Sequence, residues 1–286
     1  MKPAAFEYFA PTSLEAALDL LERHGGEAKV LAGGQSLVPA MNFRLATPAA
    51  LVDVNRIPGL DRPSVERDEL VIPMLARHAA FERPVVGDPL GPLLAETSHL
   101  VGHLPIRVRG TFAGSLAHAD PAAEWCMLTL ALDAVMVARS RAGERRIPAA
   151  EFFEGPFTTS LAEDEILTEV RLPLLRQAGT GVCEKSRTAG DFATVAVVAA
   201  LWIEEGKIAR AAVGIGGAES RPVRPVEAEA TLAGAPLEPS ALDAAAQVAA
   251  EAVDPISDHS CSADYRRHLV EVLVRRALDR ASRRAG

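Results

Sequence analysis

Lys29-Val30-Leu31-Ala32-Gly33-Gly34-Gln35-Ser36 is the stretch that decides the fold, because an apolar run typical of a strand leads directly into a glycine turn. Glycine has no Cβ, so it adopts positive φ and lets a ligand come close to the main chain. The clustered N–H groups of such a turn form a concavity that binds anions. A glycine pair between two elements is more often an ordinary turn, so the interpretation as a phosphate site needs a second segment.

That second segment is RGTFAGSLAHADP, residues 109–121, which continues into Ala122-Ala123-Glu124. Small residues, hydroxyl groups and a glycine again interrupt a chain that is apolar on both sides. Hydroxyl groups both donate and accept hydrogen bonds, so they suit phosphate oxygens. Together the two segments favour a phosphate or pyrophosphate site over two unrelated turns.

With both segments in view, the sequence resembles the FAD-binding medium subunit of the molybdenum hydroxylases, the carbon monoxide dehydrogenase and xanthine dehydrogenase group. AGGQSLVPAMNFRLA at residues 32–46 and IRVRGTFAGSLAHADPAAE at residues 106–124 are similar to that family's two flavin segments. The similarity continues through residues 165–169, residues 184–193 and residues 265–267. It spans nearly the whole chain, with the motifs in the right order.

The resemblance implies a set of FAD-binding positions in this sequence. The backbone amides of residues 30–37 would hold the FAD pyrophosphate. Thr111, Gly114 and Ser115 would hydrogen-bond phosphate through hydroxyl and amide groups. Glu124 would accept hydrogen bonds from the hydroxyls of a sugar. The complete implied set is Val30, Leu31, Ala32, Gly33, Gly34, Gln35, Ser36, Leu37, Thr111, Gly114, Ser115, Asp120, Glu124, Leu167 and Lys185.

Three of these positions need a closer description. Leu167 would pack against the adenine or flavin ring, and Lys185 would stabilise negative charge that develops at the isoalloxazine edge on reduction. The alternative for Lys185 is an exposed lysine on a strand. The alternative for Glu124 is a first-turn glutamate favoured by the helix dipole, and that role is compatible with sugar binding.

The second segment also departs from the family pattern, which usually has T-I-G-G followed by Asn or Ser. Phe112 and Ala113 stand in place of the Ile and the first Gly, and Val108 replaces a common Asn. Alanine tolerates positive φ poorly, so either Ala113 has an ordinary negative φ or the pocket is altered. We expect the negative φ, because Gly114 remains to supply the tight turn. FAD affinity is the property that this departure puts in question.

Composition and charge limit the classes of function. The chain has 286 residues, which predicts two domains, and a net charge of -8, which argues against nucleic acid as the main partner. No apolar run approaches the ~20 residues that a bilayer span requires, and the N-terminus lacks the apolar region of a signal peptide. We therefore expect a cytoplasmic protein.

The cysteines and histidines indicate no metal site on this chain. Cys126, Cys183 and Cys261 are widely separated and form no C-x-x-C pair, so they exclude a self-contained iron–sulfur cluster. Cys126 lies in an apolar helical pattern and is predicted to be a buried small hydrophobe. His99-x-x-x-His103 has helical spacing and His118 lies near Asp120, but neither pair comes with the further ligands that a metal site needs.

The order of predicted elements indicates an α+β fold. By resemblance, residues 1–176 form a two-part FAD-binding domain of the vanillyl-alcohol-oxidase (PCMH-like) type, with subdomains at about 1–56 and 57–176. Residues 177–286 would form a C-terminal domain of a three-stranded antiparallel sheet with a helical layer on one face. The β-turn-α-β start lacks G-x-G-x-x-G, so a Rossmann unit is not expected.

Capping and turn residues predict where the helices and strands begin and end. Thr12 to Glu15 is typical of a capping box that opens a helix through Leu21, with Gly25-Gly26 as its stop. Asp120 is the predicted N-cap of another helix, with Pro121 at its first position. The expected strands are residues 29–31, 51–54, 183–186, 194–203 and 208–215, and the other expected helices are residues 38–44, 122–132, 226–233, 242–252 and 263–283.

The resemblance implies electron transfer. Substrate would be oxidised at a molybdopterin cofactor on a large subunit, and electrons would pass through iron–sulfur clusters of a small subunit to noncovalent FAD in this chain. NAD+, a quinone or oxygen would then accept them, in an assembly expected to be a dimer of heterotrimers. Two alternatives stay open: a stand-alone flavin oxidase with covalent flavin, and a non-catalytic scaffold that has lost FAD. No catalytic side chain is required of this chain, since the flavin carries the chemistry.

Overall fold

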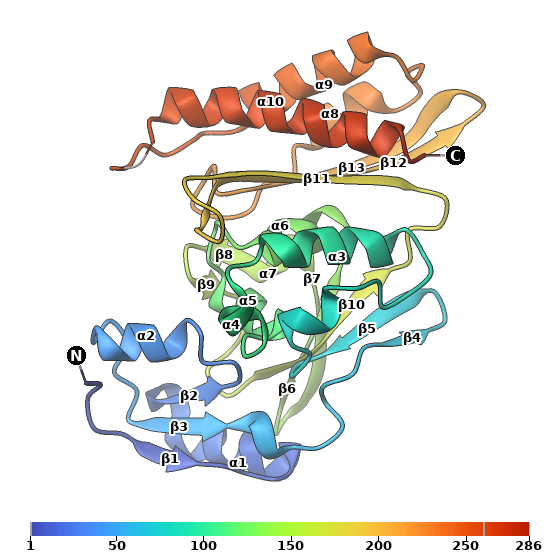
Figure 1. Ribbon diagram of the computed structural model, residues 1–286. Coiled ribbons are helices and arrows are strands. Elements are labelled where there is room, and N and C mark those ends of the chain that lie inside the picture. The colour runs from blue at the N-terminus through green and yellow to red at the C-terminus, as the bar shows by residue number, and fades with distance from the viewer. Residues whose placement is uncertain (1, 260, 286) are drawn as a thin grey trace.

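The computed structural model describes residues 2–259 and 261–285. Three layers follow one another in chain order (Figure 1): a small N-terminal unit at the bottom of the view, a central sheet with its helices, and a C-terminal sheet under three helices at the top. The fold is α+β, as predicted, and the C-terminal layer is the expected three-stranded antiparallel sheet with helices.

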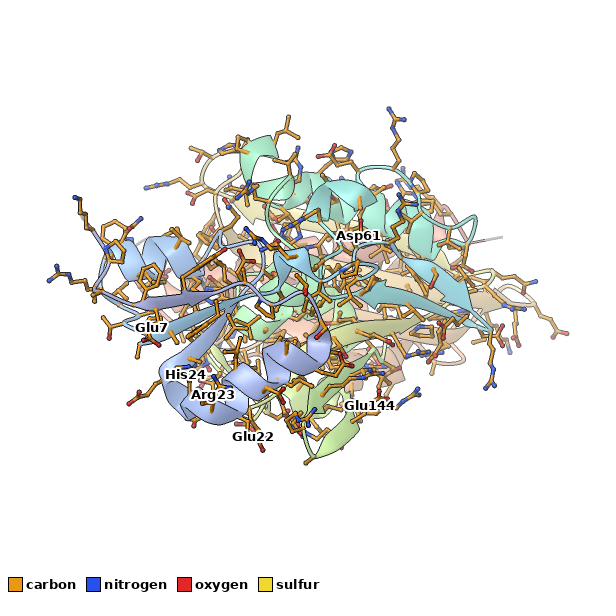
Figure 2. The ribbon with its side chains drawn as sticks, turned by 90° about the horizontal axis from the view of Figure 1, so that it is seen from below. Glu7, Glu22, Arg23, His24, Asp61 and Glu144 are labelled. Atoms are coloured by element: carbon orange, nitrogen blue, oxygen red, sulfur yellow. The ribbon has the colours of Figure 1, made fainter. Side chains whose placement is uncertain are left out.

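The N-terminal unit is a three-stranded parallel sheet in the order β1-β3-β2. Its elements are β1 (Glu7–Phe9), α1 (Leu14–His24), β2 (Ala28–Leu31), α2 (Leu37–Asn42) and β3 (Ala50–Asp53). The N-cap of α1 is Ser13, whose Oγ accepts from the N–H of Ala16 at 3.2 Å, so the predicted capping box is one residue out. Gly25, at φ 54°, ends the helix as expected. Figure 2 shows the polar last turn of α1, with Glu22, Arg23 and His24, on the underside of the molecule.

The central unit is a five-stranded antiparallel sheet in the order β4-β5-β10-β6-β7, with helices on one side and a small hairpin. Its strands are β4 (Ser64–Glu66), β5 (Glu69–Pro73), β6 (Val135–Ser140), β7 (Gly143–Pro148), β8 (Phe153–Gly155), β9 (Thr158–Thr159) and β10 (Ile166–Pro173). Its helices are α3 (Leu90–Leu100), α4 (Leu104–Arg107), α5 (Phe112–His118), α6 (Glu124–Ala131) and α7 (Ala149–Phe152).

The predicted start of α6 is wrong. The helix begins at Glu124, and the residue at its N-cap is Ala123, which has no capping side chain. Asp120 Oδ1 instead accepts from the N–H of Ala122 at 2.9 Å, which closes a turn ahead of the helix. An aspartate side chain bonds readily to the backbone two residues later, and here that local turn wins over N-capping.

The C-terminal layer agrees closely with the expected elements. Its strands are β11 (Gly179–Ser186), β12 (Ala193–Glu204) and β13 (Lys207–Gly216), and its helices are α8 (Val226–Leu232), α9 (Pro239–Ala252) and α10 (Ala263–Ser282). Strand β12 is buried on both faces: Val195 and Val197 pack with the helices, while Ala196 and Val198 pack with the central unit. A strand buried on both sides reads as a continuous apolar run, which explains why β12 shows no alternation.

The face of this sheet turned away from its own helices is covered by α6 and α3, a contact that the sequence did not predict. Gly214 of β13 marks the closest approach, since a Cβ there would lie 2.4 Å from the carbonyl oxygen of Met127 in α6. The central and C-terminal layers are therefore joined by a tightly packed interface. None of the helices among the described residues has the length and apolarity that crossing a bilayer requires.

Candidate functional site

The two glycine segments meet in space, although they belong to different units of the fold. A Cβ on Gly33 would lie 2.6 Å from the carbonyl oxygen of Arg109 and 2.6 Å from the Cα of Gly110. Only a residue without a side chain allows backbones to approach so closely. The turn after β2 and the turn before α5 thus form one surface, which we call the cradle (residues 33–37 and 109–115).

The first half of the cradle presents unpaired donors. Gly34 has φ 70°, which reverses the chain between β2 and α2. Among the described residues, the backbone N–H groups of residues 33–37 donate to no protein acceptor, and Gln35 Nε2 donates to the carbonyl oxygen of Gly33 at 3.1 Å. Val30 and Leu31 lie in β2 and are half-buried behind the turn. Free N–H groups beside a glycine turn suit a multiply charged anion such as a pyrophosphate.

The second half of the cradle is the start of α5. Thr111 is the N-cap of this helix, and its Oγ1 accepts from the N–H of Gly114 at 3.0 Å. A hydroxyl that accepts one hydrogen bond still has its own proton to donate, so the predicted role of Thr111 toward phosphate is compatible with the cap. Ser115 lies in the same helix, with its N–H on the carbonyl oxygen of Thr111 at 3.0 Å.

Ala113 has the ordinary conformation that we expected. It lies in α5, is 2 % exposed, and is absent from the residues with positive φ. The expected reason was wrong, however, because Gly114 is also helical and supplies no tight turn. Gly114 is needed because a Cβ there would lie 2.5 Å from Thr111 Oγ1, in the space that the capping hydroxyl fills. The alanine therefore leaves the backbone of the cradle regular.

The carboxyl group of Glu124 on α6 is buried and interacts electrostatically with that of Glu184 on β11, between the central and C-terminal layers. Glu124, in the first turn of α6, is 7 % exposed, and burial, followed by the nearby Glu184, raises its pKa to about 8. Burial also raises the pKa of Glu184 on β11 to about 7, and its Oε2 is buried without a hydrogen-bond partner among the described residues. Glu124 of the chain alone is therefore protonated at neutral pH, where it both donates and accepts. The helix dipole, which favours an ionised glutamate, does not explain it.

The remaining predicted positions are more scattered. Leu167 lies in β10 at a bulge, is 5 % exposed, and packs in the hydrophobic core. Lys185 is exposed on β11, directly after Glu184. Asp120 holds the turn ahead of α6. The roles of Leu167 and Lys185 toward a flavin ring stay predictions.

The next residues are the histidines that the sequence analysis considered as metal ligands. Helix α3 ends at Leu100 and Gly102 turns the chain at φ 46°, so His99 and His103, although four residues apart, do not share a helix. The ring of His118 packs against Phe157 at 5.0 Å between centroids. Cys126 is fully buried in α6, as predicted.

Sequence reasoning missed His78, which contacts the cradle at Gly110. Trp125 Nε1 donates to His78 Nδ1 at 2.9 Å, and burial lowers the pKa of His78 to about 4, so the ring is neutral. Its backbone N–H donates to the carbonyl oxygen of Gly110 at 3.1 Å, and a Cβ on Gly110 would lie 2.6 Å from His78 Nε2. The signal available was the polar Arg77-His78 pair directly after the apolar run of residues 70–76.

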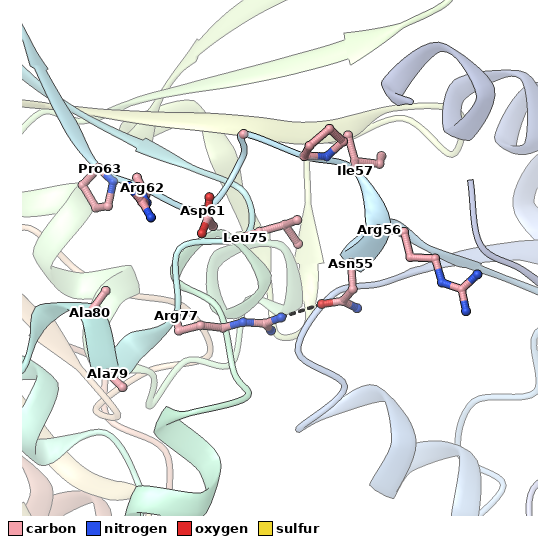
Figure 3. A pocket seen from close by; sticks show the side chains of 12 residues that line it. Asn55, Arg56, Ile57, Asp61, Arg62, Pro63, Leu75, Arg77, Ala79 and Ala80 are labelled. Carbon is pink, nitrogen blue, oxygen red and sulfur yellow. Dashed lines mark hydrogen bonds between the residues drawn. The ribbon is translucent and has the colours of Figure 1, made fainter. Parts of the chain in front are cut away.

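Sequence reasoning also missed Asn55 and Arg77, which join the two halves of the cradle. Asn55 Nδ2 donates to the carbonyl oxygen of Ala32 at 2.8 Å, one residue before Gly33. Arg77 donates through one guanidinium nitrogen to Asn55 Oδ1 at 2.5 Å and through the other to the carbonyl oxygen of Arg109. Figure 3 shows Arg77 directed at Asn55 beside an open pocket of about 820 Å³.

Comparison with known proteins identifies the family. Residues 4–175 match the FAD binding domain in molybdopterin dehydrogenase, and residues 182–281 match the CO dehydrogenase flavoprotein C-terminal domain. The 6-hydroxypseudooxynicotine dehydrogenase complex subunit alpha of Paenarthrobacter nicotinovorans is 40% identical over 287 residues, which cover 100% of this chain and 97% of that protein. The carbon monoxide dehydrogenase medium chain of Afipia carboxidovorans is 35% identical and covers 100% of this chain and 99% of its own.

A solved structure gives the same result. Carbon monoxide dehydrogenase from Hydrogenophaga pseudoflava matches with a TM-score of 0.96 at 35% identity, covering 100% of both chains. The agreement extends over the N-terminal unit, the central layer and the C-terminal layer. The resemblance inferred from the two glycine segments is confirmed: this chain belongs to the family of FAD-binding medium subunits of the molybdenum hydroxylases.

Proposed function

We propose that this chain holds one noncovalent FAD in the cradle and is the electron-transfer subunit of a molybdenum hydroxylase. When bound, FAD takes electrons from iron–sulfur clusters of a partner and passes them to an external acceptor. The observation that carries the proposal is the contact of Gly33 with Arg109 and Gly110, which brings together two segments whose N–H and hydroxyl groups suit a pyrophosphate.

The residues of the chain bind and orient in this proposal, and none performs acid–base or nucleophilic chemistry. The amides of residues 33–37 and the hydroxyl of Thr111 would hold the pyrophosphate, and residues 30–32 would support the turn from behind. Glu124 would bind sugar hydroxyls, where its buried carboxyl group both accepts and donates. Leu167 and Lys185 would act on the ring system, as an apolar contact and as a positive charge.

The partners follow from what this chain lacks. Its three cysteines are free, buried and far apart in sequence, so they do not hold an iron–sulfur cluster. An iron–sulfur small subunit and a molybdopterin large subunit would supply the electrons, in a dimer of heterotrimers located in the cytoplasm. The assembly is supported by two relatives, one named as a medium chain and the other as a subunit of a dehydrogenase complex.

The domain boundary also belongs to the proposal. We place it between residues 176 and 177, with the FAD-binding domain at 1–176 and its subdomains at 1–56 and 57–176. The support is the change from β10, which ends at Pro173, to β11, which begins at Gly179 in a different sheet. Both faces of the second sheet are buried, so the two domains would fold against each other rather than move freely.

The two rival functions lose their support. The scaffold hypothesis depended on a strained Ala113, and that residue is regular. The oxidase hypothesis requires a covalent tether and a larger substrate domain, whereas the C-terminal layer is three strands and three helices packed together.

One purification tests all three hypotheses. The chain is isolated alone and together with the products of the adjacent reading frames, and its visible spectrum is recorded before and after acid precipitation. We expect yellow flavin in the acid supernatant, copurification with an iron–sulfur chain and a molybdopterin chain, and no substrate oxidation by the isolated chain. Flavin retained in the pellet, or oxidation of an organic substrate by this chain alone at enzymatic rates, would contradict the proposal.

A further inference from the structure

A chain of polar contacts starts in the N-terminal sheet and ends at the second cofactor segment. Tyr8 on β1 donates to Asp53 Oδ2 at 2.5 Å, and Asp53 Oδ1 accepts from the backbone N–H of Asn55 at 2.9 Å. Burial opposes ionisation of Asp53, but the hydrogen bonds from Tyr8 and Asn55 hold the pKa of this carboxyl below its usual range. The carboxylate thereby fixes the orientation of Asn55.

Asn55 then uses both ends of its amide. Its Nδ2 donates to the carbonyl oxygen of Ala32 at 2.8 Å, in the first segment, and its Oδ1 accepts from Arg77 in the central unit at 2.5 Å. The two ends of one side chain therefore contact the two units. An alanine at this position would leave both contacts unmade.

Arg77 completes the connection. Its guanidinium donates to Asn55 on one side and to the carbonyl oxygen of Arg109 on the other, directly beside the point where Gly33 meets the second segment. Arg77 also pairs with Thr111 in an isolated antiparallel bridge. A planar guanidinium reaches two acceptors in a fixed fork, which a lysine ammonium cannot do with the same geometry.

We propose that Asn55 and Arg77 form a latch that holds the N-terminal unit on the central unit and so positions both halves of the cradle for FAD. They are positioning residues that act through Ala32 and Arg109. The inference rests on the proposed function for the identity of the ligand. The latch itself rests on contacts within the described chain.

The surrounding pocket supplies a matched control. Arg62 lines the same pocket as Arg77 and Asn55 (Figure 3), yet among the described residues its guanidinium makes no hydrogen bond or ion pair. Arg62→Met therefore removes a charge from the pocket without touching the latch. Any effect of Arg77→Met beyond that of Arg62→Met belongs to the contacts that Arg77 makes.

The experiment measures FAD affinity of the apo chain by flavin fluorescence, for the wild type and for Arg77→Met, Arg77→Lys, Asn55→Ala, Arg77→Met with Asn55→Ala, and Arg62→Met. Loss of a hydrogen bond to a charged group predicts about a tenfold weaker affinity for Arg77→Met and Asn55→Ala. Arg77→Lys should recover part of the loss. The double variant should be weakened by much less than the product of the two single effects, because both substitutions break the same connection.

Hydrogen exchange of the apo chain separates positioning from general destabilisation. In Arg77→Met and in Asn55→Ala, exchange should increase together at the hydrogen-bonded amides of the first segment, which are those of β2, Val38 and Ala40, and in residues 108–116, while residues 193–216 exchange as in the wild type. A local defect would raise exchange in only one of the two segments, and a global defect would raise it everywhere. Where Arg77→Met does not fold, Asn55→Ala and Arg77→Lys carry the test.

The inference is overturned when Arg77→Met and Asn55→Ala bind FAD as Arg62→Met does, when their effects multiply in the double variant, or when only one segment gains exchange. A wild-type chain that binds no FAD would contradict the proposed function instead. In that case the exchange measurements still decide whether the latch exists.

Discussion

The cradle and the C-terminal sheet are stabilised by different kinds of contact. Strand β12 is buried on both faces by apolar side chains, between its own helices and the central layer. The cradle is two turns from different units, joined by a glycine contact and by the latch formed by Asn55 and Arg77. The C-terminal sheet therefore depends on apolar area and close packing. The cradle depends on a glycine contact and a few polar contacts, and we expect their loss to weaken ligand binding before it destabilises the fold.

The comparison predicts the largest change in stability where the sheet packs most tightly. Gly214→Val places side-chain atoms where even a Cβ would lie 2.4 Å from the carbonyl oxygen of Met127 and 2.9 Å from the Cβ of Ala131. Because backbone atoms of α6 must move, we expect a loss of about 3 kcal/mol in the free energy of unfolding. Urea denaturation followed by circular dichroism measures it.

The control for that variant is Gly155→Val, at a position in β8 where an added Cβ meets no atom within 4 Å. We expect this variant to unfold at nearly the wild-type urea concentration. Equal destabilisation by the two substitutions would show that the interface between the central and C-terminal layers is not tightly packed.

The next prediction concerns the buried carboxyl pair between the layers. The pKa of Glu124 in the folded chain is about 8, above the ordinary value of 4.5, so the folded state keeps a proton that the unfolded state loses. Its contribution to stability is therefore present at low pH and is lost as the pH rises toward about 8. Glu124→Gln should remove the part of the pH dependence that Glu124 contributes and gain roughly 3 kcal/mol at pH 8 relative to pH 5, when compared with the wild type.

The measurement is urea denaturation of the apo chain at several pH values between 5 and 8, with the exposed Glu154→Gln as the control. Parallel curves for Glu124→Gln and the wild type would show that Glu124 ionises normally. The FAD affinity of Glu124→Gln tests the proposed sugar contact separately from the pH dependence. The glutamine amide at this position accepts a hydrogen bond but does not ionise.

A smaller effect is expected inside the cradle. Ala113 is helical and has no positive φ, so Ala113→Gly adds freedom to the unfolded chain without relieving strain. The free energy of unfolding should fall by roughly 1 kcal/mol and FAD affinity should stay within about twofold. A clear gain in FAD affinity in fluorescence titration would indicate that the methyl group crowds the cofactor.

The same contrast explains what could be predicted from the sequence. The sequence predicts the strands and helices after residue 179 to within a few residues. Each of these elements has a long apolar pattern, and such a pattern can be recognised from adjacent residues alone. β1 was missed, since three residues carry no period. The prediction of Asp120 as an N-cap is wrong because an aspartate suits both a cap and the competing turn to Ala122, so the residue type does not separate them.

The sequence predicts the two backbone segments of the candidate site, but not most of the side chains that join them. Glycine turns and hydroxyls near Gly33 and Thr111 are local signals, and the structure brings the two segments that contain them together. The partners of Asn55, Arg77 and Glu184 lie far away in sequence. A single polar residue forms no sequence pattern from which such a distant contact could be predicted. The resemblance implies a role for Lys185, whereas no local pattern distinguishes the adjacent Glu184, whose carboxyl oxygen Oε2 is buried.

The central claim, that two segments meet at Gly33 to form the FAD cradle, is tested most directly by Gly33→Ala. A Cβ there would lie 2.6 Å from backbone atoms of Arg109 and Gly110, so the two halves must separate, whereas at Gly87 it meets no atom within 4 Å. Fluorescence titration of the apo chains with FAD should show a loss of at least about tenfold in affinity for Gly33→Ala and none for Gly87→Ala. Equal affinities for Gly33→Ala, Gly87→Ala and the wild type would contradict the account.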